Sequence, residues 1–247
     1  MERDVFRTYY VNIYGEVGLG SGGHVSDWVV KLGGSVITCK DIPYCFRLDV
    51  MNNIAKQILR ISEGSKVVLV HGGGSFGHYE ASISDSSRTS RTSHSMITLN
   101  FLVNSVLRDQ NIPTYTVPGR FFSMNAVNDV LSNGMIPVIF GDILANGMVI
   151  SGDDITIEIA RNGYKAIFLT DVEGIMNSDG KVLECVESTD EFPLIDSNVS
   201  DVTGGILTKV RKILEAGINA IIANPGDENI LRITSGIRVG TRVGKCD

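Results

Sequence analysis

The residues best suited to chemistry lie in one short segment, 71–78 (HGGGSFGH). It holds four glycines and two histidines in eight residues, directly after an apolar run. Glycine lets backbone N–H groups approach an anion closely, and a helix starting there would add further free N–H groups. A protonated His78 can donate a charge-assisted hydrogen bond to a phosphate, whereas His71 suits a structural role. The segment predicts an anion site, although it matches neither the P-loop nor the GxGxxG pattern.

Four further turns combine glycine with charged or hydroxyl residues. Lys31 lies in an apolar run just before a glycine pair, where a lysine is costly unless it meets an anion or reaches solvent. The turns are Lys31 with Gly33, Gly34 and Ser35; Ser151-Gly152-Asp153-Asp154; Thr170-Asp171 with Gly174; and Gly204-Gly205 with Lys209. The paired acids would orient lysines or Mg²⁺, although the helix dipole alone also favours acids at a helix start. These residue types supply positioning and charge neutralisation, which favours phosphoryl transfer.

The elements that must position these turns alternate along the chain. Apolar runs predict strands over 28–32, 66–70, 112–117, 136–140, 166–170, 220–223 and 239–243. Apolar residues at helical spacing predict helices over 48–61, 96–107, 125–133, 153–161 with an aspartate cap, and 208–216. The order predicts an α/β fold, a three-layer α/β/α sandwich with a mostly parallel central sheet, in which the turns converge at the carboxyl ends of the strands.

Composition limits the class of protein. The chain has 247 residues, 43% of them hydrophobic, and a net charge of -6, which fits a folded domain and argues against a nucleic-acid partner. No apolar run is long enough to span a membrane, so no membrane partner is expected. The four cysteines lack metal-binding spacing and a chain of this length does not need disulfides, so we expect a reducing cytoplasm and no role for Cys39. A Gly/Ser-rich stretch predicts that residues 1–27 form a flexible extension, leaving one domain over 28–247.

Taken in order, these motifs resemble the amino acid kinase family. The resemblance covers about residues 28–243 and rests on 31–35, 71–74, 152–154, 170–175 and 201–209. Within that family, the string 72–78, with Lys40 after the first turn and the paired acids, resembles the isopentenyl phosphate kinases. These enzymes use Mg-ATP to phosphorylate isopentenyl phosphate, giving isopentenyl diphosphate in an archaeal-type mevalonate route.

The resemblance implies a role for each motif. ATP would contact Lys31, Gly33, Gly34, Ser35, Gly74, Thr170, Asp171, Gly174, Gly205 and Lys209. The acceptor phosphate would contact Gly73, Gly74, Gly77, His78, Gly152 and Asp153. Catalysis would fall to Lys31, Lys40, His78, Asp154 and Lys209, with Asp154 fixing Lys31 and Lys209. The N-terminal part of the domain would bind the acceptor and the C-terminal part ATP. Mg²⁺ is expected mainly through the ATP phosphates, and a homodimer is expected from the family.

Three questions stay open. Segment 79–95, rich in Ser, Thr and Arg, predicts a disordered surface loop or a lid whose Arg88 and Arg91 approach phosphate. The acceptor's apolar tail needs a pocket, and its candidates suit the core equally well: Ile97, Leu99, Phe101, Phe121, Phe122 and Met124. The functional alternatives are a phosphonate kinase of the fosfomycin type and a non-catalytic ligand-binding protein of the same fold. Loss of the lysines or the acid would favour the last.

Overall fold

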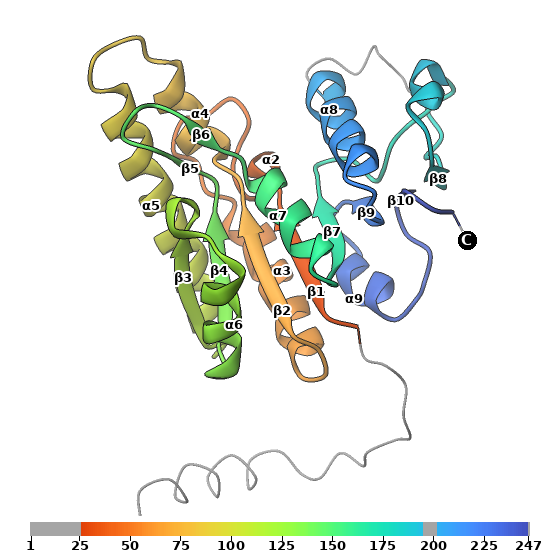
Figure 1. Cartoon of the computed structure of the whole chain (residues 1–247), viewed down its shortest axis with the longest axis horizontal. Coiled ribbons are helices and arrows are strands. Elements are labelled where there is room, and N and C mark those ends of the chain that lie inside the picture. Colours follow the sequence, from red (N-terminus) through yellow and green to blue (C-terminus); the bar gives the residue numbers. More distant parts are fainter. Residues whose placement is uncertain (1–25, 195–201, 247) are drawn as a thin grey trace, which may run out of the picture.

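The computed structural model describes residues 26–194 and 202–246, so all but the end of the extension predicted over 1–27 lies outside the described residues. Its central sheet contains β1 (Trp28–Leu32), β2 (Val67–His71), β3 (Thr114–Pro118), β4 (Ile136–Phe140), β7 (Lys165–Leu169), β8 (Cys185–Val186), β9 (Ala220–Ala223) and β10 (Thr241–Val243). Their order in the sheet is β3-β4-β2-β1-β7-β9-β10-β8 (Figure 1). All neighbours run parallel except β9 and β10. The predicted mostly parallel sheet is confirmed.

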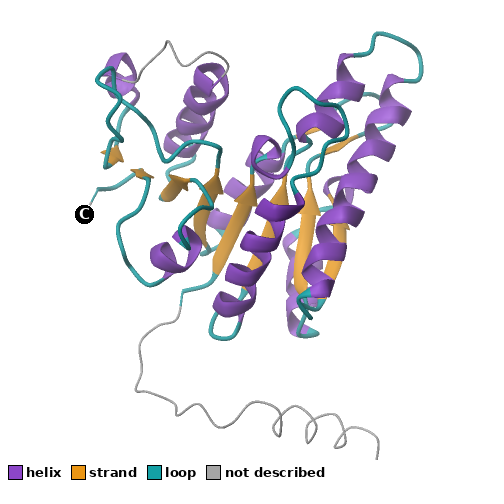
Figure 2. Ribbon diagram, turned by 180° about the vertical axis from the view of Figure 1, so that it is seen from behind, coloured by secondary structure: helices purple, strands orange, loops and turns teal. Residues whose placement is uncertain are grey.

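Helices cover both faces of this sheet (Figures 1 and 2). On one face lie α3 (Leu48–Ser62), α5 (Arg88–Asp109) and α9 (Asn229–Thr234), and on the other α6 (Met124–Ser132), α7 (Gly152–Arg161) and α8 (Val202–Glu215). The shorter elements are α2 (Gly34–Ile37), α4 (Gly74–Ser82), the 3₁₀ turns η1 (Gly119–Phe121) and η2 (Thr189–Leu194), and a hairpin of β5 (Asp142–Ile143) and β6 (Val149–Ile150). The three-layer architecture is confirmed. The two-residue strands carry no periodicity that the sequence could reveal.

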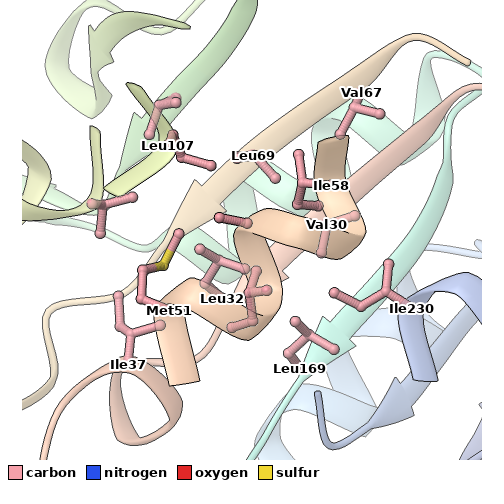
Figure 3. Packing of buried hydrophobic residues seen from close by; sticks show 14 of the residues in the cluster. Val30, Leu32, Ile37, Met51, Ile58, Val67, Leu69, Leu107, Leu169 and Ile230 are labelled. Atoms are coloured by element: carbon pink, nitrogen blue, oxygen red, sulfur yellow. The ribbon is translucent and has the colours of Figure 1, made fainter. Parts of the chain in front are cut away.

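The central strand β1 is buried between the two helical layers. Alternate side chains of a strand face opposite sides of the sheet. Val30 and Leu32 therefore join the core under α3, where Met51 and Ile58 cover them (Figure 3). Val29 belongs to the opposite core cluster, beneath α6, α7 and α8. Lys31 alternates with Leu32 and thus lies on the α7 side, on a strand that close packing holds rigid.

The segment 79–95 is mostly helical, which corrects the prediction of a disordered loop. Helix α4 continues to Ser82, and α5 begins at Arg88. The Nε of Arg91 lies 2.5 Å from Oε2 of Glu80, whose side chain is only 4% exposed. This ion pair joins the two helices, so Arg91 has a structural partner. The start of α5 has no apolar periodicity to predict a helix, because its first buried residues are Thr92 and Ser95.

The four cysteines form two disulfides, Cys39 with Cys45 and Cys185 with Cys246. Their Cα atoms lie 5.3 Å and 5.9 Å apart. The expectation of unpaired thiols and of an incidental Cys39 is therefore wrong. Sequence spacing alone could not show it, because the second pair is 61 residues apart and meets only in the folded sheet. In the part of the chain that the structure describes, no helix is long and apolar enough to cross a membrane.

Candidate active site

A cavity of about 760 Å³ opens at the carboxyl ends of β1, β2, β4 and β7. In a doubly wound sheet this edge is where ligands bind. The predicted site residues that line the cavity are Lys31, Gly33, Gly34, Ser35, Lys40, Gly73, Gly74, Gly77, His78, Gly152, Asp153, Thr170, Asp171, Gly205 and Lys209. Two predicted residues, Asp154 and Gly174, lie outside it. Turns that are far apart in sequence thus meet at one place.

The glycine turns after β1 and β2 touch each other backbone to backbone. A Cβ atom on Gly34 would lie 2.3 Å from the Gly74 nitrogen. Gly74 has a φ of +46°, and a Cβ there would lie 2.1 Å from Oγ1 of Thr38. That hydroxyl accepts the Ser75 N–H at 2.9 Å and donates to the Gly34 carbonyl at 2.7 Å. Only glycine fits at these two positions, and the result is one continuous backbone wall along the cavity.

Three helices start at this wall. They are α2, α4 and α7, whose first residues Gly34, Gly74 and Gly152 all line the cavity. At the start of α4, the Ser75 N–H donates to Oγ1 of Thr38, and the Phe76 and Gly77 N–H groups donate to the Gly73 carbonyl. Among the described residues the Gly74 N–H has no such partner, so it stays available to a ligand. Helix α7 is capped by Oγ of Ser151, which accepts the Asp153 N–H at 3.2 Å, in place of the predicted aspartate cap. Partial positive charge at helix starts favours an anion in the cavity.

A largely buried ion pair lines the cavity. Lys31 Nζ is 2.8 Å from Oδ1 of Asp153, and the two side chains are 9% and 23% exposed. Burial favours the neutral acid, but the positive charges of Lys31 and Lys209 outweigh it and hold the pKa of Asp153 below its ordinary value. The carboxylate is therefore ionised at neutral pH and joins the ends of β1 and α7.

Lys209 brings a second positive charge to the same place from α8. Burial lowers its pKa to about 8, and the neighbouring charge of Lys31 acts in the same direction. Asp153 and Asp171 partly offset both effects. Because the charge of Lys31 disfavours the charge of Lys209, an anion bound between the two lysines would be stabilised.

Asp154 does not fix the two lysines as predicted. It is 57% exposed and forms an ion pair at 2.6 Å with Lys212 on the outer side of α7 and α8. Successive helix residues point about 100° apart, so only one of two adjacent acids can face the cavity. The acid that faces the cavity is Asp153.

Gly174 also has a different position from the one predicted. A Cβ on it would lie 2.6 Å from Val182 Cγ1 and 2.7 Å from Oγ1 of Thr241. The same threonine accepts the N–H of Ile175 at 2.8 Å. Glycine is required here so that the turn after β7 can pack against β10, away from the cavity.

His71 is fully buried beneath the glycine wall. Burial lowers its pKa to about 4, so the ring is neutral. Nε2 lies 3.1 Å from Nδ2 of Asn100, and Nδ1 lies 3.0 Å from the Gly72 carbonyl. An amide nitrogen can only donate, so Nε2 accepts and Nδ1 carries the proton that it donates to Gly72. The predicted structural role of His71 fits this arrangement.

The apolar wall of the cavity was missed by sequence reasoning. It contains Ala81, Met96, Ile143, Val149 and Ile150. Of the six residues predicted for an apolar pocket, Leu99 is buried in the core cluster on the α3 side of the sheet, and Phe122 and Met124 pack against the cluster on the α7 side. Ile97, Phe101 and Phe121 are exposed. The wall comes from the β5–β6 hairpin, from the end of α4 and from the first turns of α5. The two-residue strands of the hairpin have no periodicity from which this wall could be predicted.

Met96 lies directly beside the glycine turn that α4 begins with. Its sulfur would be 2.9 Å from a Cβ on Gly73 and 2.7 Å from a Cβ on Gly77. The apolar wall therefore adjoins the predicted anion site. A ligand that carries both a phosphate and a short hydrocarbon chain matches this pairing.

Comparisons with known proteins agree with this geometry. The model of the amino acid kinase family matches residues 28–224. The isopentenyl phosphate kinase of Methanothermobacter thermautotrophicus is 31% identical over 264 residues, covering 87% of this chain and 98% of that protein. The enzyme of the same description from Methanocaldococcus jannaschii is 29% identical over 255 residues, covering 87% and 97%. A crystal structure of the T. acidophilum isopentenyl phosphate kinase product complex superposes with a TM-score of 0.70 at 26% identity, covering 88% of this chain and 99% of that one.

Proposed function

Because the chain belongs to the amino acid kinase family, we propose that it transfers the γ-phosphoryl group of ATP to isopentenyl phosphate. An oxygen of the acceptor phosphate bonds to the γ-phosphorus. The bond from that phosphorus to the β,γ-bridging oxygen breaks, and ADP leaves with the electron pair. The products are ADP and isopentenyl diphosphate. The observation that carries the proposal is one cavity that combines two lysines about a buried carboxylate with a glycine wall and an apolar side.

The two substrates are assigned to opposite sides of β1. On the β7 and α8 side, ATP would contact Thr170, Asp171, Gly205 and Lys209. On the β2 and α4 side, the acceptor phosphate would contact Gly73, Gly74, Gly77 and His78. Lys31 lies on the strand between β2 and β7, which suits a residue that contacts the transferring group. Within the domain proposed over 28–247, the N-terminal part would hold the acceptor and the C-terminal part the nucleotide.

Charge neutralisation is the main task of these residues. The acceptor oxygens are already ionised near neutral pH, so no strong general base is needed, and repulsion between two anions opposes the reaction. Lys31 and Lys209 would offset the charge on ATP, while Lys40, His78 and the Gly74 N–H would offset the charge on the acceptor. Asp153 would keep the two lysines in place.

Mg²⁺ is proposed to enter with ATP. Within residues 26–194 and 202–246, no group of three or more His, Cys, Asp or Glu side chains is placed to hold a metal ion. The carboxylates of Asp153 and Asp171 line the cavity and fit a role as outer partners of a nucleotide-bound ion. When bound, the ion would neutralise charge on the β- and γ-phosphates.

Two broader assignments are part of this proposal. A cytoplasmic location is supported by the need for ATP. The cysteines do not support it, because all four are paired in disulfides. A homodimer is supported by large apolar side chains near the β3 edge of the sheet. These are Phe101, Tyr115 and Phe121, which are 65%, 55% and 69% exposed.

A coupled ADP-release assay on the purified chain tests the proposed function. The acceptors are isopentenyl phosphate, other small monophosphates, and fosfomycin as the phosphonate alternative. We expect the highest kcat/KM with isopentenyl phosphate. A preference for fosfomycin would replace this proposal with the phosphonate kinase, and ATP binding without ADP release on any acceptor would favour a non-catalytic protein.

A further inference from the structure

The Cys39–Cys45 disulfide closes a small loop at the edge of the cavity. The two cysteines are six residues apart, between α2 and α3, and three of the enclosed residues line the cavity, namely Lys40, Asp41 and Pro43. Both cysteines are half-buried and residues 40–44 are exposed. A reagent in solution can therefore reach the loop.

This loop is attached to α4, the helix that carries His78. The Tyr44 N–H donates to the Ser75 carbonyl at 3.4 Å, and Oγ of Ser75 donates to the Cys45 carbonyl at 3.5 Å. The Tyr44 ring packs edge-on against Phe76, with centroids 5.1 Å apart. Its hydroxyl donates to the buried carboxylate of Glu80. The position of the loop and the position of α4 are thus linked.

Tyr44 has a backbone conformation that a non-glycine residue rarely adopts, with a φ of +57°. Such a conformation persists only where surrounding contacts impose it. The contacts here are those to α4 and the covalent closure at Cys39 and Cys45. Opening the closure removes one constraint on a residue that is not at its own preferred geometry, so we expect the loop to relax.

The second disulfide is a natural control. Cys185 and Cys246 do not line the cavity; they join β8 to the segment after β10. The Gly244 N–H already donates to the Val186 carbonyl at 3.0 Å, so hydrogen bonds hold the same two segments together. Its reduction should leave the cavity as it is.

We propose that Cys39–Cys45 is a redox-sensitive modification site, and that its reduction by a dithiol weakens binding of the phosphate acceptor by loosening the contacts of Tyr44 with α4 and displacing Lys40, which lies on the same loop. A thiolate of the dithiol attacks one cysteine sulfur and forms a mixed disulfide, and the other cysteine leaves as a thiolate. The second thiol of the reagent then attacks the mixed disulfide. The reagent ends as its cyclic disulfide, and two electrons and two protons have passed to Cys39 and Cys45.

Steady-state kinetics on the oxidised and the dithiothreitol-reduced full chain tests this proposal, with alkylation and mass spectrometry to report the state of each cysteine. It rests on the proposed function, because isopentenyl phosphate is the probe. We expect reduction to raise the acceptor KM about threefold to tenfold, with little change in the ATP KM, since a shift of the loop misplaces only the acceptor contacts. Reoxidation should restore the original value.

Two double variants separate the cysteine pairs. Cys39→Ser with Cys45→Ser should have the raised KM in both conditions, and Cys185→Ser with Cys246→Ser should respond as the unmodified chain does. An acceptor KM that stays constant while mass spectrometry finds Cys39 and Cys45 reduced would overturn the proposal. Thiols at both positions in protein treated with oxidised glutathione would also overturn it.

Hydrogen exchange keeps this test separate from the proposed function. If the oxidised chain does not act on isopentenyl phosphate at all, the proposed function fails, but the loop can still be examined. We expect reduction to speed amide exchange over 39–46 and the first turn of α4. Unchanged exchange there would overturn the redox proposal on its own.

Discussion

Two lysine–aspartate ion pairs lie on different sides of helix α7, and only one of them is in the cavity. Lys31 and Asp153 meet at 2.8 Å on the inner side, with side chains 9% and 23% exposed. Lys212 and Asp154 meet at 2.6 Å on the outer side, with side chains 38% and 57% exposed. The outer pair is the shorter one, yet water screens it, whereas the inner pair acts through protein. Burial, and not distance, distinguishes the pair that can control a transferring phosphate.

Burial also determines how much is lost when one partner of an ion pair is removed. Removing one partner of a buried pair leaves an uncompensated charge, whereas removing one partner of an exposed pair leaves a charge that water solvates. The inner and outer acids are adjacent in sequence and share the same helix. The two sites are therefore matched: each is a lysine–aspartate ion pair, and they differ only in how exposed they are.

The largest effect is expected for the inner acid. Asp153→Asn keeps the shape of the side chain but removes the charge that holds Lys31 and Lys209, which repel each other. We expect kcat to fall about a hundredfold to a thousandfold, since the preorganised charges at the transferring phosphate are lost. Steady-state ADP release measures this. An activity within threefold of the unmodified chain would show that Asp153 is not the organising acid.

His78 sharpens the comparison because it is exposed and still lines the cavity. His78→Asn should raise the acceptor KM about tenfold to a hundredfold with ATP binding intact, because a charge-assisted hydrogen bond to the acceptor phosphate is lost. Acceptor kinetics together with calorimetry of ATP binding check both parts. Unchanged acceptor constants would rule out contact between His78 and that phosphate.

The protonation of Lys209 should make ATP binding in the cavity depend on pH. Its pKa of about 8 lies below the ordinary 10.5, so the folded protein loses this charge as pH rises through 8. ATP affinity should fall about tenfold between pH 7 and pH 9, when most of the lysine is neutral. Protein stability should change in the opposite direction to ATP affinity. Between about pH 8 and 10.5 Lys209 is protonated in the unfolded chain but largely neutral in the folded one, so its contribution to the free energy of unfolding rises with pH.

Calorimetric titration with ATP over this pH range measures the effect. Lys209→Arg is the matched control, because an arginine keeps its charge throughout. We expect the pH dependence to disappear in that variant. An equal slope in both proteins would assign the effect to another group.

The smallest effect is expected for the outer acid. Asp154→Asn should change kcat by less than about twofold and the free energy of unfolding by less than about 1 kcal/mol, because its ion pair with Lys212 is exposed. The same kinetic assay and a denaturant titration measure these values. A loss of activity as large as that of Asp153→Asn would reverse the assignment of the two acids.

The sequence predicted the layers and the meeting point of the turns, because strand, glycine turn and helix follow one another repeatedly and parallel strands end at one edge. It did not predict which of Asp153 and Asp154 faces inward, since the rotation of α7 about its axis depends on how its apolar residues pack in the folded core. It also missed the cysteine pairs, which depend on loop and sheet geometry. Gly174 looked like a nucleotide contact because a glycine needed for packing against Thr241 has the same sequence signature as one that admits a ligand.

The most direct test of the central claim is a ³¹P NMR spectrum of the purified chain with Mg-ATP and isopentenyl phosphate. We expect the γ-phosphate signal of ATP and the monophosphate signal of the acceptor to fall together, while two coupled diphosphate signals of isopentenyl diphosphate and those of ADP rise in equal amounts. ADP accompanied only by inorganic phosphate, or a spectrum that does not change, would contradict phosphoryl transfer to this acceptor.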